Sequence, residues 1–258
     1  MRALVTGGGV RLGRAMALYL AGRGYDVAVH YRSSADGAAD VVAEIRAMGR
    51  RAVAVQADLL DEAQTAGLVG AASDGLGGAL DLLVNNASIF EHDTIRNATR
   101  ESWDRHMGSN LRAPFVLIQG FAAQAPEAGT DANGEPVARA LAVNMIDQRV
   151  KKLTPEFMTY TLAKVGLWAL TRTAAQALAP AVRVNAIAPG PTMQGTRQSA
   201  SHFAAQRAAT VLERGADADD ICAALGYLLD ARAVTGQLLC VDGGQHLAWR
   251  TPDVQGVE

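Results

Sequence analysis

The sequence predicts one α/β domain in which a doubly wound parallel sheet lies between two layers of helices. Seven short β-branched or apolar runs alternate with longer stretches of helical periodicity, an alternation typical of consecutive βαβ units. The strand runs are almost continuously apolar, as expected for strands covered by helices on both faces. No long polar linker or solenoid-length repeat divides the 258 residues, so we expect a single three-layer domain over 1–258.

The elements are predicted in order from local patterns. Strands are expected at 2–5, 26–30, 52–56, 81–85, 137–144, 182–187 and 238–242. The first helix carries one apolar stripe at helical spacing, made of Leu12, Ala15, Met16, Tyr19 and Leu20. Gly22 and Gly24 end this helix before the second strand. The polar stretch 127–136 is expected to be a surface turn, and the tail 247–258 to be loosely ordered unless it docks on a partner subunit.

Composition argues against several classes of protein. Apolar residues make up 49% of the chain and charged residues 19%, with a net charge of −2, a balance typical of a globular domain and unlike that of a nucleic-acid binder. Cys222 and Cys240 are too few for a disulfide framework, so a reducing, cytoplasmic compartment is expected. No apolar run reaches the roughly 18 residues of a membrane span, and no signal-peptide pattern precedes the first strand. The histidines lack metal-ligand spacing, so no metal is expected.

A glycine-rich turn follows the first predicted strand. It reads TGGGVRLG over residues 6–13 and lies where a Rossmann-type fold passes from strand to helix. Glycines there allow the backbone to approach a pyrophosphate, whose charge is favoured by the amides and dipole of the helix N-terminus. The common pattern GxGxxG is not met, because Leu12 stands at its third glycine, and the alternative is a turn that is merely tight. The candidate cofactor contacts in this turn are Gly7, Arg11, Leu12 and Gly13.

The residues after the second strand predict which nicotinamide cofactor binds. The run HYRSS at 30–34 stands where an NAD enzyme offers an acidic side chain to the ribose hydroxyls. An arginine with neighbouring hydroxyls suits a 2′-phosphate, because guanidinium groups form charge-assisted bonds to phosphate. We therefore expect NADP(H); otherwise Arg32 is a solvated loop residue. The expected contacts are His30, Tyr31, Arg32 and Ser33.

Asp58 and Leu59 follow the third predicted strand. At this position a carboxylate can bond an adenine edge, so both residues are candidate cofactor contacts. The alternative for Asp58 is a helix N-cap.

Tyr160 and Lys164 are a candidate catalytic pair. They lie four residues apart in a helical stretch, so both side chains project from one face. A nearby ammonium favours the phenolate and should lower the pKa of Tyr160 toward the working range of an acid–base catalyst. Such a spacing is common on helix surfaces. Here it occurs with NNAS at 85–88, with Asn110 before the fifth strand, and with PGPT at 189–192 after the sixth.

With these residues together, the chain resembles the short-chain dehydrogenase/reductase family over essentially its whole length. The resemblance is carried by 6–13, 85–87, Asn110, Tyr160 with Lys164, 189–190 and the VDGG run at 241–244. It implies that Tyr160 donates a proton, that Lys164 binds the nicotinamide ribose and tunes Tyr160, and that Asn110 holds a water of a proton relay. The implied cofactor contacts are Asn85 and Ala87 on the adenosine side, and Pro189, Gly190 and Thr192 around the nicotinamide amide.

Two departures from the family pattern narrow the prediction. Arg11 replaces the middle glycine of the family's TGxxxGxG turn, and Asp147 stands where most members have the serine that steadies a substrate carbonyl. A carboxylate facing a ketone oxygen is repulsive unless it is protonated. A carboxyl group beside a ring nitrogen instead supports proton transfer to that nitrogen, directly or through Tyr160. The alternative for Asp147 is a capping or surface carboxylate.

Both departures match the pteridine reductase branch, which this chain resembles more closely than it resembles a generic ketoreductase. The shared features are RLG at 11–13, HYRS at 30–33, Ser88 with Phe90, and Asp147. The resemblance implies that a pterin ring lies between the nicotinamide and Phe90, with Arg11 and Ser88 bonding the pterin and the cofactor phosphates. The alternative for Phe90 is an apolar loop anchor.

The sequence thus predicts NADPH-dependent reduction of a dihydropterin to the tetrahydropterin, with Tyr160 and Asp147 protonating the ring nitrogen. Two alternatives stay open: an NADPH-dependent carbonyl reductase such as a 3-oxoacyl reductase, and a catalytically silent NADP(H)-binding regulatory protein. The family places a substrate lid at 192–214, whose mixed side chains identify no ligand. The resemblance also implies a homotetramer, with contacts through the helix around Trp168 and the last strand.

Overall fold

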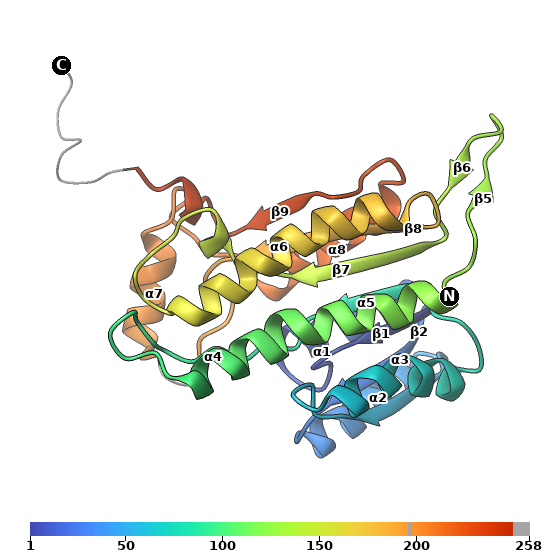
Figure 1. The fold of residues 1–258 in the computed structure, drawn as a ribbon, viewed down its shortest axis with the longest axis horizontal. Coiled ribbons are helices and arrows are strands. Elements are labelled where there is room, and N and C mark those ends of the chain that lie inside the picture. Colours follow the sequence, from blue (N-terminus) through green and yellow to red (C-terminus); the bar gives the residue numbers. More distant parts are fainter. Residues whose placement is uncertain (196–197, 250–258) are drawn as a thin grey trace.

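A computed structural model describes residues 1–195 and 198–249, so the expected tail at 247–258 lies outside the described residues from 250 onward. The centre of the molecule is a seven-stranded sheet in which every pair of neighbours is parallel (Figure 1). In sheet order the strands are β3 (Ala52–Gln56), β2 (Asp26–Tyr31), β1 (Arg2–Val5), β4 (Leu82–Asn85), β7 (Ala140–Met145), β8 (Val182–Pro189) and β9 (Leu238–Val241). The predicted fold class, a doubly wound α/β sheet, is confirmed.

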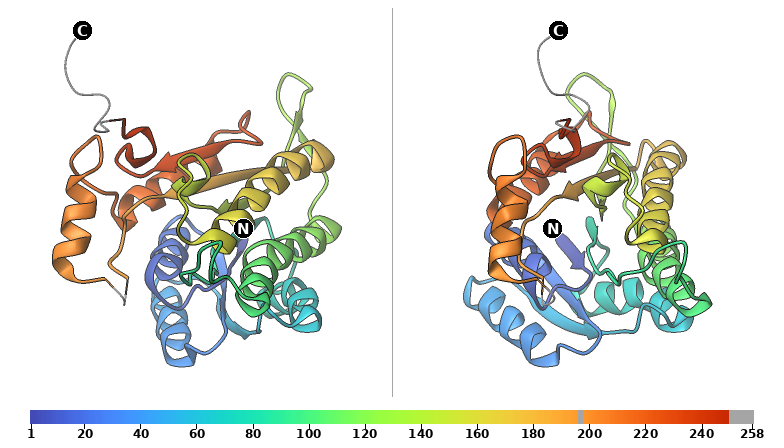
Figure 2. Two further views of the ribbon diagram at one scale, coloured as in Figure 1. Left: turned by 60° about the vertical axis from the view of Figure 1, so that its left-hand side comes forward. Right: turned by 90° about the vertical axis from the view of Figure 1, so that its left-hand side faces the viewer.

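Two apolar layers cover the faces of the sheet (Figure 2). One contains α1 (Arg11–Gly22), α2 (Ala35–Ala47) and α8 (Ala218–Asp230), and the other contains α3 (Glu62–Leu76), α5 (Ala113–Gln124) and α6 (Met158–Leu178). The stripe predicted for the first helix faces this core, because Met16 and Leu20 are fully buried. The helices α4 (Arg100–Met107) and α7 (Ala200–Ala208) lie outside these two layers, and a π-helical turn, Gly108–Arg112, joins α4 to α5.

The starts of two helices follow from the residue before them. Asp61 caps α3 by accepting a hydrogen bond from the Gln64 N–H at 3.0 Å, and Thr99 forms a reciprocal capping box with Ser102 at the start of α4. In contrast, α6 begins after Phe157, whose φ is +57° and whose side chain caps nothing. The helix that carries the candidate catalytic pair therefore needs a cap from elsewhere in the chain.

The fifth strand of the sheet differs from its prediction at 137–144. The structure has a short antiparallel hairpin, β5 (Gly129–Thr130) and β6 (Pro136–Val137), before β7 begins at Ala140. The predicted polar turn forms the hairpin tip, where Asp131 Oδ1 accepts hydrogen bonds from the N–H groups of Asn133 and Glu135. Figure 1 shows the hairpin at the end of the molecule opposite α7.

The carboxyl ends of the parallel strands meet at one edge of the sheet, toward α7 in Figure 1. In open α/β sheets, ligands bind outside these ends. The glycine turn follows β1, the HYRS run closes β2, the NNAS run closes β4, and Asp147 follows β7. The topology therefore brings these distant segments to the same edge. No helix of the described residues is long and apolar enough to cross a membrane.

Candidate active site

The glycine turn is a close meeting of backbone segments. Gly7 has a φ of +62°, and a Cβ on Gly13 would lie 2.0 Å from the Gly7 carbonyl oxygen. Any side chain at Gly13 would therefore push the start of α1 away from the turn. Arg11 has a φ of +53°, which explains why the family pattern has glycine at this position. The next residue, Leu12, packs against the core beneath the turn.

His30 lies beneath this turn and holds it. Its Nδ1 accepts a hydrogen bond from the Gly7 N–H at 3.0 Å, and its Nε2 lies 3.1 Å from the Ala57 carbonyl oxygen. Burial lowers the pKa of His30, so the imidazole is neutral, with its proton on Nε2. Both ring nitrogens are thus engaged by the backbone, and the residue predicted as a cofactor contact supports the turn from below.

Thr6 and Asn86 hold the turn from the other side, a role the sequence analysis missed. The Thr6 hydroxyl accepts hydrogen bonds from the N–H groups of Asn86 and Ala87, both at 2.9 Å. The Asn86 amide donates to the carbonyl oxygens of Thr6 at 2.9 Å and Gly7 at 3.3 Å. The sequence signal for these hydrogen bonds is that the Thr-Gly run at 6–7 and the Asn-Asn-Ala run at 85–87 occur in the same chain.

The segment expected to bind the 2′-phosphate lies open to solvent at the end of β2. Arg32 and Ser33 are exposed and Tyr31 is half-buried. Arg32 forms no ion pair with any residue in the described part of the chain, although its carbonyl oxygen accepts a hydrogen bond from the Gln56 amide at 3.2 Å. A phosphate would therefore meet this guanidinium without displacing a carboxylate.

The alternative interpretation of Asp58 as a helix N-cap is wrong, because Asp61 caps α3. Asp58 Oδ1 accepts a hydrogen bond from the Leu60 N–H at 3.0 Å, and the Asp58 N–H donates to Gln64 at 2.8 Å. Leu59 is buried beside it. Asp58 and Leu59 therefore form a fixed turn at the carboxyl end of β3.

Asp147 joins the pair Tyr160 and Lys164. The Tyr160 hydroxyl donates a hydrogen bond to Asp147 Oδ2 at 2.9 Å, and Asp147 Oδ1 accepts one from the Arg149 N–H at 2.9 Å. Lys164 Nζ donates to the Met145 carbonyl oxygen at 2.8 Å. Asp147 thus caps the short 3-10 helix Gln148–Val150, as its alternative interpretation expects, and it also accepts the tyrosine's hydrogen bond; its role in proton transfer stays a prediction.

Burial sets the protonation of these three groups. Burial and the neighbouring Asp147 carboxylate raise the pKa of Tyr160 well above 10, and a hydrogen bond with Ser88 opposes the rise. The predicted lowering of the Tyr160 pKa by Lys164 is therefore wrong. Burial also raises the pKa of Asp147, and it lowers the pKa of Lys164 to about 8. At neutral pH Tyr160 is protonated and Lys164 is mostly charged.

Asn110 is buried in the π-helical turn before α5. Its amide oxygen accepts a hydrogen bond from the Ile89 N–H and its amide nitrogen donates to the Ile89 carbonyl oxygen, both at 2.8 Å. Asn110 thus holds the loop that follows β4. Asn85, at the end of β4, is also buried, and its amide donates to Asn144 in β7 at 2.8 Å. Asn85 Oδ1 has no hydrogen-bond partner in the described residues.

An aromatic shelf, defined here as Phe90, Phe157 and Tyr160, lines the site beside Asp147. Phe90 stacks on Phe157 with ring centroids 4.3 Å apart, and it meets Tyr160 edge to face at 4.7 Å. The guanidinium of Arg149 lies 4.8 Å from the Phe157 centroid. Phe157 was missed by the sequence analysis, and no local pattern points to it, because it stands between a loop and a helix.

The segments after β8, expected to surround the nicotinamide amide, lie at the same edge of the sheet. A Cβ on Gly190 would lie 2.6 Å from the Cβ of Asp242, and the Thr192 hydroxyl donates to the Gly190 carbonyl oxygen at 3.1 Å. The expected lid at 192–214 contains α7, with residues 196–197 outside the described part. The Arg11 guanidinium donates to the carbonyl oxygens of Met193 and Gln194 at 3.1 and 2.9 Å, so it links the glycine turn to this segment.

The remaining reactive side chains form no second centre within the described ranges. No group of three or more His, Cys, Asp or Glu residues there is placed to hold a metal ion. Cys222 is a buried core residue, and burial raises the pKa of its thiol to about 11.

The whole chain is similar to known proteins. The family profile described as Enoyl-(Acyl carrier protein) reductase matches residues 9–246. The 3-oxoacyl-(acyl-carrier-protein) reductase FabG of Staphylococcus aureus is 31% identical over 250 residues, which cover 95% of this chain and 98% of that protein. The crystal structure of FolM alternative dihydrofolate reductase 1 from Brucella suis in complex with NADP has a TM-score of 0.91 and 43% identity, and covers 98% of both chains.

A further solved structure widens the comparison. The short-chain dehydrogenase from Burkholderia cenocepacia in complex with NADP has a TM-score of 0.85 and 33% identity, and the match covers 95% of this chain and 97% of that one. The profile, the relatives and the Tyr160–Lys164 pair on α6, which packs against the parallel sheet, lead to one conclusion. The chain belongs to the short-chain dehydrogenase/reductase family of oxidoreductases.

Proposed function

We propose that this oxidoreductase uses NADPH to reduce a dihydropterin to the tetrahydropterin. The observation that carries the proposal is the hydrogen bond between Tyr160, a member of the aromatic shelf, and Asp147, which stands where a carbonyl reductase of this family has a serine. The 43% identity to a FolM alternative dihydrofolate reductase over 98% of the chain supports the same substrate class.

NADP(H) fits the carboxyl edge of the sheet. The tight contact at Gly13 keeps side chains away from the pyrophosphate position, and the exposed Arg32 has no carboxylate partner among the described residues. Related structures contain NADP. When bound, the cofactor supplies the hydride that reduces a carbon of the substrate ring. We assign its contacts to the glycine turn, to 30–33, to Asp58 and Leu59, to Asn85, Ala87 and Ser88, to Tyr160 and Lys164, and to the loop 189–192.

The proton comes from the pair Tyr160 and Asp147. Their raised pKa values favour keeping protons on this pair. The Asp147 carboxylate first takes up a proton from solvent, so that the pair holds two; a ring nitrogen then takes the proton of the Tyr160 hydroxyl, and Asp147 returns its own to the tyrosine oxygen. The negative charge then rests on a carboxylate instead of a phenolate, because a carboxyl group is the stronger acid. Lys164 stabilises that charge.

Substrate binding is assigned to residues around this proton path. A pterin ring stacked on the face of Phe90 that Phe157 leaves uncovered would present its ring nitrogen to Tyr160 and Asp147, since Tyr160 meets Phe90 edge to face. Ser88 and Arg11 are the other two residues that we assign to substrate binding. Arg11 donates to lid carbonyl oxygens in the structure, so in this proposal it exchanges those bonds for the substrate and the cofactor phosphates.

Carbonyl reduction is the second candidate. The observation that favours it is the 31% identity to a 3-oxoacyl-(acyl-carrier-protein) reductase over 95% of the chain. A silent NADP(H)-binding regulator is less well supported, because Tyr160, Lys164 and Asn110 are all present and buried.

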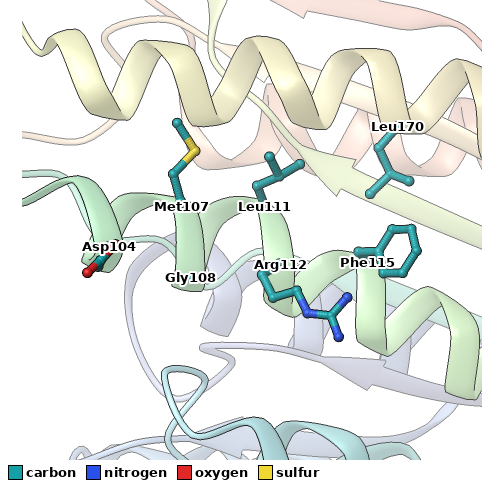
Figure 3. Close-up of a pocket in the computed structure, with 7 residues that line it drawn as sticks. All are labelled: Asp104, Met107, Gly108, Leu111, Arg112, Phe115 and Leu170. Atoms are coloured by element: carbon teal, nitrogen blue, oxygen red, sulfur yellow. The ribbon is translucent and has the colours of Figure 1, made fainter. Parts of the chain in front are cut away.

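We also propose a homotetramer. A pocket of about 470 Å³ opens beside α4, α5 and α6, lined by Asp104, Met107, Gly108, Leu111, Arg112, Phe115 and Leu170 (Figure 3). Exposed apolar side chains on the same helices include Trp103, Phe115, Leu162 and Val165. Exposed apolar surface of this kind is typical of a subunit contact. Light scattering on the purified protein would measure the mass.

The deciding experiment compares two substrates side by side. Purified protein is mixed with NADPH and either a 7,8-dihydropterin or an acetoacetyl ester, and NADPH oxidation is followed by absorbance. Faster turnover of the pterin is expected. Turnover of the ester alone would assign the protein to carbonyl reduction, and NADPH binding without turnover of either would favour the regulator.

A further inference from the structure

The missing cap of α6 is supplied from the loop that precedes α4. We name residues 86–99 the Phe90 loop. Asp93 Oδ1 in this loop accepts a hydrogen bond from the Thr159 N–H at 3.1 Å, and the Asp93 carbonyl oxygen accepts one from the Met158 N–H at 3.2 Å. The Thr159 hydroxyl donates to Asp93 Oδ2 at 2.5 Å. A carboxylate at this position satisfies N–H groups at the helix start and is favoured by the helix dipole.

The same contacts continue back to the Phe90 loop through His106. The Thr159 hydroxyl uses its hydrogen to bond Asp93. Its oxygen therefore accepts a hydrogen bond from His106 Nδ1, which lies 2.7 Å away. His106 Nε2 accepts a hydrogen bond from the Glu91 N–H at 3.2 Å. Burial lowers the pKa of His106, so the neutral ring with its proton on Nδ1 is the form that fits both contacts.

These contacts fix the residues on both sides of Phe90. Asn110 bonds both backbone groups of Ile89, and His106 bonds the N–H of Glu91. Phe90 in turn packs on Phe157 and Tyr160, which flank Thr159 in the first turn of α6. The Phe90 loop and the start of α6 are therefore joined in two ways. The aromatic rings pack together, and a series of hydrogen bonds runs from Asp93 through Thr159 and His106 to Glu91.

We propose that Asp93 is a positioning residue that, through Thr159 and His106, fixes the Phe90 loop relative to Tyr160 and so aligns the substrate's stacking surface with the proton donor. The stacking part rests on the proposed function, and the mechanical coupling does not. Asp93, Thr159 and His106 are 3%, 2% and 0% exposed, so water cannot replace a lost partner. Removing one member leaves buried donors unsatisfied and frees the loop.

The first test is kinetic and uses Asp93→Asn, which keeps the shape and removes the charge and one acceptor. We expect kcat/KM for the dihydropterin to fall about ten- to hundredfold, as small misplacements of reacting groups do. The Kd for NADPH should stay within about twofold, since Asp93 touches none of the assigned cofactor contacts. The matched control is Asp61→Asn, which changes a capping aspartate on α3 and should leave both constants unchanged. Wild-type kcat/KM in Asp93→Asn would overturn the proposal.

Two further variants separate positioning from a general loss of stability. Thr159→Val removes only the hydroxyl that links Asp93 to His106, and it should reproduce the loss seen in Asp93→Asn. Thr159→Ser restores the hydroxyl and should recover most of the activity. In a Phe90→Ala background, Asp93→Asn should lose much of its effect, because both changes act through the same loop. Fully additive effects would contradict the coupling.

Hydrogen exchange tests the coupling without any substrate. In Asp93→Asn, amides of the Phe90 loop and of the first turn of α6 should exchange faster together, whereas Asp61→Asn should affect α3 alone. Loosening of only one of the two segments would overturn the inference, whatever the enzyme reduces. If the wild-type protein reduces only the acetoacetyl ester, the proposed function fails while this measurement still decides the coupling.

Discussion

The two halves of the carboxyl edge are built in different ways. On the half that we assign to the cofactor, backbone groups make the site: the turn at 6–13 is held by Thr6, His30 and Asn86 through bonds to main-chain atoms. On the substrate half, side chains from distant segments make it, as in the bonds between Asp147 and Tyr160 and between Asp93 and Thr159. A backbone site suits a cofactor shared by a whole family. A side-chain site can change its substrate by single replacements.

The largest expected effect lies where the two halves meet. Tyr160→Phe removes the hydroxyl that passes the proton and should lower kcat about 10²- to 10⁴-fold, the usual contribution of a positioned proton donor. The Kd for NADPH, measured by fluorescence titration, should change little, because the assigned cofactor contacts are almost all elsewhere. A loss of NADPH affinity as large as the fall in kcat would show that Tyr160 serves cofactor binding as much as proton transfer.

Gly13→Ala should break the cofactor half alone. Its Cβ would lie 2.0 Å from the Gly7 carbonyl oxygen, so the turn must move, and we expect a loss of about 3 kcal/mol in the free energy of unfolding together with NADPH binding. The matched control is Gly70→Ala, which meets nothing within 4 Å inside α3 and should stabilise the protein by about 0.5–1 kcal/mol. Denaturant unfolding measures both, and equal stability of the two variants would contradict the backbone argument.

The same contrast explains how much the sequence could predict. The strands follow from apolar runs and the cofactor turn from a local string of glycines, since those features depend on neighbours in the chain. Asp147 was found because it departs from a family pattern. Phe157 and the chain from Asp93 to His106 depend on side chains that meet only after folding. The pKa of Tyr160 was predicted in the wrong direction because helical spacing does not reveal burial or a carboxylate 13 positions earlier.

Asp147→Ser should alter the substrate half and leave the cofactor half intact. The serine restores the family's usual carbonyl-binding hydroxyl and removes the carboxyl group that returns a proton to Tyr160 in the proposed mechanism. We expect kcat/KM for a dihydropterin to fall about 10²-fold and some acetoacetyl ester reduction to appear. Assays with both substrates measure this change in substrate preference. An unchanged pterin rate would remove Asp147 from the mechanism.

Lys164 should make kcat/KM depend on pH. Burial lowers its pKa to about 8, so the ammonium loses its proton, and with it the charge that stabilises the proton path, as the pH rises through that value. We expect kcat/KM to fall on the alkaline side, about tenfold per pH unit above 8. Lys164→Arg stays charged throughout this range, so its profile should be flat there at a lower rate. An alkaline limb that persists in Lys164→Arg would assign the titration to another group.

Arg32 should show the smallest effect, because it is exposed and we assign it to a single phosphate. If its guanidinium binds the 2′-phosphate, Arg32→Gln should raise the Kd for NADPH about tenfold and leave that for NADH unchanged. Arg50→Gln is the control. It changes an exposed arginine just before β3, at the other end of the strands from Arg32, and it should leave the Kd of both cofactors unchanged. Parallel titrations with the two cofactors measure the difference. A parallel loss of NADPH and NADH affinity would mean that Arg32 supports the fold of this loop, and side-chain recognition would then be confined to the substrate half.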